Sequence, residues 1–301
     1  MTVVESEVAV SPVFQRISTV RKVKNSLATV LVTLAFVVAI VPLVWLLVTV
    51  LGKGYRALLD GHWWQRSLKG VLPEQFAGGV YHAIYGTLVQ GLVCALIAVP
   101  IGVLTAIYLV EYGENGRLAR LTTFMVDILS GVPSIVAALF VFAVWISTLG
   151  FSQSAFAVSL ALVLLMLPVV VRSSEEMLRL VPDELREASY ALGIPKWKTI
   201  VRIVLPTAMS GMITGVMLAL ARVMGETAPV LVLVGYSRSI NYNVFDGNMA
   251  SLPLLIYTEL TNPEAAGVQR VWGAALTLII VIMFFNLLAS IISRLSAVKS
   301  R

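Results

Sequence analysis

Six long apolar runs limit this 301-residue chain to one kind of fold. An α-helix rises about 1.5 Å per residue, so about 20 apolar residues cross a hydrocarbon layer about 30 Å thick. Prolines interrupt several runs, which is tolerated in membranes where neighbouring helices or cavity water satisfy the freed backbone groups. We predict an all-α polytopic membrane protein with six transmembrane helices, at about residues 27–51, 83–110, 121–148, 154–172, 206–235 and 271–293.

The composition agrees with a bilayer-embedded chain and excludes a soluble one. Hydrophobic residues make up 58% of the sequence, charged residues 13%, and the mean hydropathy is +0.92. The net charge of +6 does not indicate nucleic-acid binding, because Lys and Arg gather at the ends of apolar runs instead of forming a basic stripe. Cys94 has no second cysteine to pair with, and His62 and His82 are far apart in the sequence, so we predict no metal site.

The distribution of basic residues predicts the orientation of the spans. With the N-terminus in the cytoplasm, fifteen Lys and Arg residues lie inside and six lie outside. The start of the chain lacks the basic leader of a signal peptide, so we expect the first span to be retained. We predict a multi-pass protein of the cytoplasmic (plasma) membrane with both termini inside, divided into a cytoplasmic segment 1–26, a transmembrane domain 27–293 and a cytoplasmic tail 294–301.

The longest predicted inner loop, 173–205, has the pattern of two short helices that meet at a glycine elbow. Pro182 and Asp183 favour a helix start, Gly193 a helix end, and Pro195 the start of a second helix. Apolar side chains recur at helical spacing along both helices, at Leu185, Ala188 and Leu192 and then at Trp197, Ile200, Val201 and Val204. Such a stripe fits a groove on a soluble partner, and it equally fits the surface of an anionic lipid layer.

The fifth run contains two charged residues, Arg222 and Glu226. They are four residues apart, so we expect them to share one helix face. Pro229 removes the amide that would bond the carbonyl of Gly225, which loosens the backbone beside the charges. Placing an arginine at mid-bilayer costs about 2.5–3.5 kcal/mol on insertion scales. Two readings explain its retention: an anion site built on the guanidinium, or an ion pair that holds spans together.

Two further charged residues lie at the ends of spans. Asp127 precedes the break Ser130-Gly131-Val132-Pro133-Ser134 by one turn, so it either lines an inner mouth or pairs with an arginine. Arg172 ends the fourth run, where a positive-inside anchor is a sufficient explanation. The outer loop 236–270 is polar and rich in Asn, which fits either a docking surface or a hydrated connection.

Two sets of motifs carry a family resemblance. The order Glu187-Ala188-Ser189, Gly193, Ile203 and Leu205-Pro206 is similar to the EAA loop of ABC-importer permeases, with Ser189 where that family usually has a second alanine. The second set resembles the PstA-type permease subunit of the bacterial phosphate-specific (Pst) ABC importer, strongly over about residues 80–235. It comprises Ala221-Arg222, Gly225-Glu226-Thr227-Ala228-Pro229, Ser130-Gly131-Val132-Pro133-Ser134 and Leu167-Pro168-Val169-Val170-Val171-Arg172.

This resemblance implies a type I (MetI-like) permease fold whose cytoplasmic coupling-helix loop, about 173–205, sits in a cleft of an ATPase subunit. The coupling residues would be Asp183, Leu185, Glu187, Ala188, Ser189, Gly193 and Trp197. By the same resemblance, Arg172 and Arg222 are tied to phosphate passage and Glu226 lies beside the path. We add Asp127 to this substrate pathway from its position alone.

The resemblance also implies the partners. They are a second, related permease subunit that forms a heterodimer with this chain, two ATPase subunits, an extracytoplasmic phosphate-binding protein and the membrane lipid, with no nucleic acid. The chain contains no G-x-x-x-x-G-K-[ST] motif, so ATP and magnesium are expected to bind the ATPase subunit. We therefore expect no cofactor on this chain, and a non-catalytic permease subunit of an ATP-driven importer of inorganic phosphate.

Three alternatives remain open from the sequence. A permease of the same architecture could carry another oxyanion, such as sulfate or molybdate. A stand-alone secondary carrier would need ion-coupling carboxylates and usually two matching halves, whereas the sequence shows no internal repeat. A membrane scaffold for phosphate signalling would move no substrate.

Overall fold

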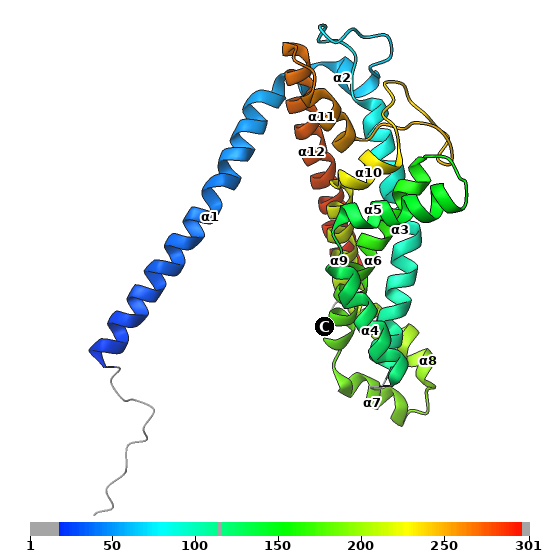
Figure 1. The fold of residues 1–301 in the computed structure, drawn as a ribbon. Coiled ribbons are helices and arrows are strands. Elements are labelled where there is room, and N and C mark those ends of the chain that lie inside the picture. Colours follow the sequence, from blue (N-terminus) through cyan, green and yellow to red (C-terminus); the bar gives the residue numbers. More distant parts are fainter. Residues whose placement is uncertain (1–17, 114–115, 297–301) are drawn as a thin grey trace, which may run out of the picture. The chain divides into compact units, whose positions relative to one another are not determined.

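The computed structural model describes residues 18–113 and 116–296, and within these ranges all the regular elements are helical (Figure 1). The predicted cytoplasmic segments fall largely outside them, because residues 1–17 and 297–301 are not described. The chain divides into two compact units, residues 1–49 and 50–301, which we describe separately.

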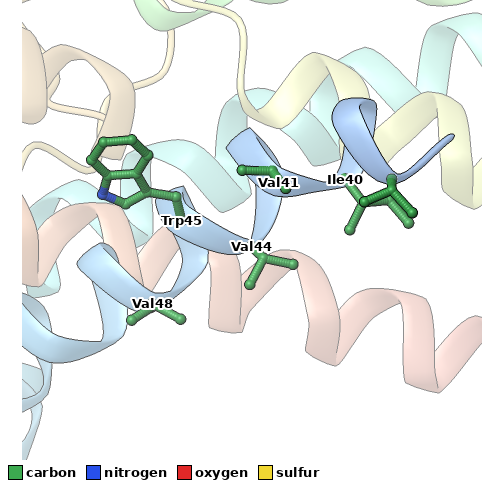
Figure 2. A pocket seen from close by; sticks show the side chains of 6 residues that line it. Ile40, Val41, Val44, Trp45 and Val48 are labelled. Carbon is green, nitrogen blue, oxygen red and sulfur yellow. The ribbon is translucent and has the colours of Figure 1, made fainter. Parts of the chain in front are cut away.

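The first unit consists of the greater part of one helix, α1 (Thr19–Leu59). The predicted span 27–51 forms the middle of this longer helix. A single helix cannot bury its own side chains, and its most apolar stretch has a mean hydropathy of 2.9, which suits it to lipid. Ile40, Val41, Val44, Trp45 and Val48 line a shallow apolar groove along it (Figure 2).

The second unit is built around α6 (Ala155–Arg179). Of its most apolar stretch, 61% is buried, against 22% for the helix that begins with α3 (Tyr81–Ile107). Small residues allow close packing: a Cβ on Gly102 would lie 2.7 Å from Val170. α6 packs against α3 and α9 (Leu205–Met224), and α12 (Ala265–Ser296) packs against α9. A π-helical turn, η2 (Tyr108–Tyr112), continues α3.

The predicted third span is bent rather than straight. α4 (Arg117–Ser130) meets α5 (Ser134–Val141) and the π-helical turn η3 (Phe142–Thr148) at an angle of 106°. Pro133 explains the break, because proline donates no backbone hydrogen bond and disfavours helix at the residue before it. Among the described residues, five helices could each cross a membrane, and the number is six if the bent pair counts as one span.

At one end of the second unit, the predicted loop 173–205 is mostly helical. α6 continues to Arg179, and α7 (Asp183–Ala191), α8 (Lys196–Thr199) and the π-helical turn η4 (Ile200–Val204) follow. α8, η4 and α9 form one continuous helix, Lys196–Met224. In Figure 1, α7 and α8 lie together at the end opposite to α2 (Gly61–Gln65).

At the other end lie α2, α10 (Ala228–Leu233) and α11 (Leu252–Leu260) (Figure 1). The expectation that 236–270 is a polar loop is wrong for its second half, because α11 packs against α12 and Leu252 to Leu255 are buried. Arg270, which we expected in that loop, is buried in α12. Its guanidinium lies 2.9 Å from Glu259 and donates hydrogen bonds to the carbonyls of Leu72, Pro73 and Gln75.

Candidate functional site

The charged stretch of the fifth predicted span lies at a helix break. α9 ends at Met224, and the amides of Gly225 and Glu226 donate to the carbonyls of Arg222 and Val223, both at 3.2 Å. α10 begins at Ala228, and Pro229 in its first turn supplies no amide. The expectation that Arg222 and Glu226 share one helix face is therefore wrong, because no continuous helix joins them.

Arg222 presents an unpaired guanidinium. Its side chain is exposed, and in the described part of the chain it makes no hydrogen bond or ion pair. It lies 17 residues after the start of α9, or about 25 Å along the helix axis. A planar cation with five donors, in the last turn of an apolar helix, is suited to an oxyanion.

Glu226 is half-buried and lines a narrow cavity beside the break. The cavity leaves about 10 Å³ for the centre of a water molecule, about the space that one water needs. Gln90 and Ser251 also line it, and the buried Gln90 Nε2 and Ser251 Oγ have no hydrogen-bond partner among the described residues. Glu226 therefore shares this cavity with polar groups that need a partner such as water.

Arg172 lies between two carboxylates. Its guanidinium forms an ion pair with Asp127 of α4 and a second, at 2.9 Å, with Glu175 of α6. Arg179 pairs with the other oxygen of Glu175 at 2.5 Å. The cluster thus joins α4 to α6 and balances two cations with two anions.

The two arginines of the predicted pathway lie at different depths. A Cβ on Gly215 of α9 would touch Ser173, the residue after Arg172, so these two positions are level. Arg222 is seven residues beyond Gly215, roughly 10 Å further along α9. The structure therefore brings Arg172 and Asp127 into contact nearer the α7 end. Arg222 lies farther from that end and, with both residues in the described part of the chain, makes no hydrogen bond or ion pair with Glu226.

The predicted elbow is present. α7 begins after Pro182, Gly193 has a φ of +74°, and α8 begins after Pro195. The side chains of Ser189 and Thr199 are buried and share a hydrogen bond of 2.8 Å, which ties α7 to α8.

The elbow also presents an apolar surface. Leu185, Tyr190, Leu192 and Trp197 are exposed, as are the predicted coupling residues Asp183, Glu187 and Ala188. The apolar stripe that we predicted as continuous is wrong, because Ile200 and Val204 are buried in the protein core. Trp197 faces outward instead, 62% exposed.

Arg186 is a residue that the sequence reasoning missed. Its guanidinium contacts Glu111 of η2 through two N–H groups, at 2.9 and 3.2 Å. The two residues are 75 positions apart, so no local pattern in the sequence could connect them.

The fold and these sites define a class of protein. Residues 98–300 match the family described as "Binding-protein-dependent transport system inner membrane component". The chain therefore belongs to this family of membrane permease components.

Full-length relatives narrow the assignment to the PstA permease proteins, which confirms the resemblance predicted from the sequence. "Phosphate transport system permease protein PstA 1" of Mycobacterium tuberculosis (strain CDC 1551 / Oshkosh) is 70% identical over 280 residues, 93% of this chain and 92% of that protein. The PstA protein of Mycobacterium leprae (strain TN) is 70% identical over 91% of this chain and 90% of that protein. The PstA protein of Pasteurella multocida (strain Pm70) is 36% identical over 90% of this chain and 95% of that protein.

Solved structures share the fold. A chain of the bacterial alginate ABC transporter, in complex with its pentasaccharide-bound periplasmic protein, aligns with a TM-score of 0.64 and 14% identity over 92% of this chain and 97% of that chain. A chain of the inward-facing MetNI methionine ABC transporter aligns with a TM-score of 0.58 and 22% identity, over 72% of this chain and 94% of that chain. The predicted all-α, MetI-like permease fold is confirmed.

Proposed function

We propose that this chain is the permease subunit of an ABC importer that moves inorganic phosphate across the cytoplasmic membrane. The observation that carries the proposal is the 70% identity, over 93% of the chain, to a phosphate transport permease. The unpaired guanidinium of Arg222 agrees with it, because an anionic substrate would supply the missing hydrogen-bond acceptors.

In this proposal the chain guides phosphate and performs no covalent chemistry. Arg222 meets the phosphate oxygens through its planar fork. Glu226 accepts the hydrogen bond of a protonated phosphate oxygen and keeps binding weak enough for release. Arg172 lies nearer the α7 end, where its ion pair with Asp127 must exchange for the substrate before phosphate leaves.

The energy comes from separate subunits. The exposed apolar surface of the elbow, which includes Leu185 and Trp197, fits a groove on an ATPase subunit that binds ATP and magnesium. A second, related permease subunit covers the face of α9 that exposes Arg222, and together the two chains enclose the pore. The α7–α8 end and both termini lie in the cytoplasm, and an external phosphate-binding protein docks at the α2–α11 end.

The test is uptake of labelled phosphate by cells that lack their own system and carry this one. Arg222→Ala removes a charge-assisted contact worth about 1.5–3 kcal/mol, so uptake should fall by a factor of roughly 10 to 150. Arg120→Ala, which removes an exposed arginine of α4, is the matched control and should leave uptake within twofold.

Three results would count against parts of this proposal. Uptake of sulfate or molybdate without phosphate would indicate another oxyanion. Uptake without any co-purifying ATPase would indicate a secondary carrier. Full phosphate uptake by the Arg222→Ala variant would indicate that this residue lies off the path.

A further inference from the structure

The end of α3 is attached to both helices of the elbow. Glu111 and Tyr112, the last two residues of η2, contact Arg186 of α7 and Lys196 of α8. Glu111 Oε1 accepts hydrogen bonds from Arg186 at 2.9 and 3.2 Å, and Lys196 Nζ lies 5.1 Å from the centre of the Tyr112 ring. These four residues form what we term the α3 clasp.

Every N–H group of the Arg186 guanidinium donates a hydrogen bond. Two N–H groups donate to Glu111, and the others donate to the carbonyls of Leu178 and Val181 and to Asp183. Five hydrogen bonds match the five N–H donors of arginine, which fixes the orientation of the side chain. α7 is therefore attached to the end of α3 and to the end of α6 at once.

Within the clasp, the Arg186–Glu111 pair is more buried than the other ion pairs at this end. The side chains of Glu111 and Arg186 are 4% and 13% exposed, whereas those of Asp127 and Arg179 are 59% and 67% exposed. Water competes weakly with a buried, multiply bonded pair, so it can transmit force between helices. The hydrogen bond between Ser189 and Thr199 connects the two helices of the elbow, so we expect them to move together.

We propose that the Arg186–Glu111 pair transmits the movement of the ATPase subunits from the elbow to α3. Arg186 and Glu111 are positioning residues in this scheme, since neither contacts substrate or nucleotide. The inference rests on the proposed function, because it requires that an ATPase moves the elbow. The inference adds that the elbow moves α3 directly through this ion pair, as well as moving α9, which continues from α8.

The test compares variants of the assembled complex in lipid vesicles. Arg186→Met with Glu111→Leu replaces the pair by apolar side chains of similar volume, which keeps the site packed. The phosphate imported per ATP hydrolysed should fall at least tenfold while the ATPase still co-purifies. Glu111→Gln keeps one acceptor oxygen and should show a smaller loss, about threefold. Arg202→Gln removes an exposed arginine of η4 and should stay within twofold of the parent.

A purely structural role predicts a different pattern. In that case the apolar pair restores both assembly and coupling, and a coupling ratio within twofold of the parent overturns the proposal. If the double variant does not assemble, Glu111→Gln decides: an unchanged ratio in its assembled complex overturns the proposal equally.

A second readout separates this proposal from the identity of the substrate. The variant carries Arg222→Cys and Cys94→Ala, so that its one thiol is at position 222. The rate at which a membrane-impermeant reagent labels this thiol shows whether ATP changes access to the pore. With the clasp intact, ATP should change the labelling rate at least threefold, and with the apolar pair it should not. Equal ATP-dependent changes in both would overturn the role of the clasp. No change even with the clasp intact would instead contradict the proposed ATP-driven mechanism.

Discussion

Gly193 allows a quantitative test of the elbow. Its φ of +74° is strained for any residue with a Cβ, and no atom lies within 4 Å of the position that a Cβ would occupy. Substitution therefore changes backbone strain without a steric clash. A left-handed conformation costs an L-residue about 1–2 kcal/mol, less for Asn and more for a β-branched residue.

The expected order of activity follows from these energies. A cost of about 1 kcal/mol lowers the population of the intact elbow about fivefold relative to competing conformations. Phosphate-stimulated ATP hydrolysis by the purified complex should therefore decrease in the order Gly193, Gly193→Asn, Gly193→Ala and Gly193→Val. Asn should retain more than half of the activity, Ala should lose about fivefold, and Val tenfold or more.

Gly52 supplies the control for this series. It also has no atom within 4 Å of an added Cβ, but it lies in α1 with ordinary helical geometry. Gly52→Ala should leave activity unchanged, because alanine is favoured over glycine in a helix by roughly 0.5–1 kcal/mol. The strain argument would be refuted if Gly193→Ala were as active as the parent. It would also be refuted if Gly193→Asn and Gly193→Val lost the same fraction of ATP hydrolysis.

Two further predictions concern other parts of the second unit. Arg270→Met leaves the buried carboxylate of Glu259 without its cation, so the free energy of unfolding, measured by thermal unfolding in detergent, should fall by about 3–5 kcal/mol. Adding Glu259→Gln should recover part of this loss. A loss under about 1 kcal/mol would show that the ion pair does not stabilise this end of the protein. Trp197→Glu changes an exposed side chain, so stability should change by less than about 0.5 kcal/mol. Co-purification of the ATPase should nevertheless fall about 30-fold, as for an interface tryptophan worth about 2 kcal/mol, and full retention would place the contact elsewhere.

Patterns in the sequence predicted the features that depend on residues close together in the chain. Apolar runs located the helices that are long and apolar enough to cross a membrane, because a bilayer stabilises any sufficiently long apolar helix. Pro182, Gly193 and Pro195 located the elbow, because each restricts the backbone in its own way. The helix break at Gly225 could also have been predicted, since Gly225 and Pro229 were both noted, but the i, i+4 argument assumed an unbroken helix.

The features that were missed depend on contacts between distant parts of the chain. Glu111 and Arg186 lie 75 residues apart, and each alone resembles an ordinary charge at the end of a span. Arg270 was counted as an outer-loop charge because burial with Glu259 cannot be read from hydropathy alone. The pairing of Asp127 with Arg172 was one of two options, and the sequence could not choose between them.

The continuous helix from Lys196 to Met224 has a mechanical consequence. Arg222 lies 26 residues from its base, or about 40 Å away, so the helix is suited to act as a lever arm with the proposed ATPase contact at its base. A tilt of only about 10° at the elbow would carry the guanidinium sideways by about 7 Å, further than the reach of a single hydrogen bond. A small tilt at the elbow could thus move the Arg222 guanidinium out of contact with a bound anion.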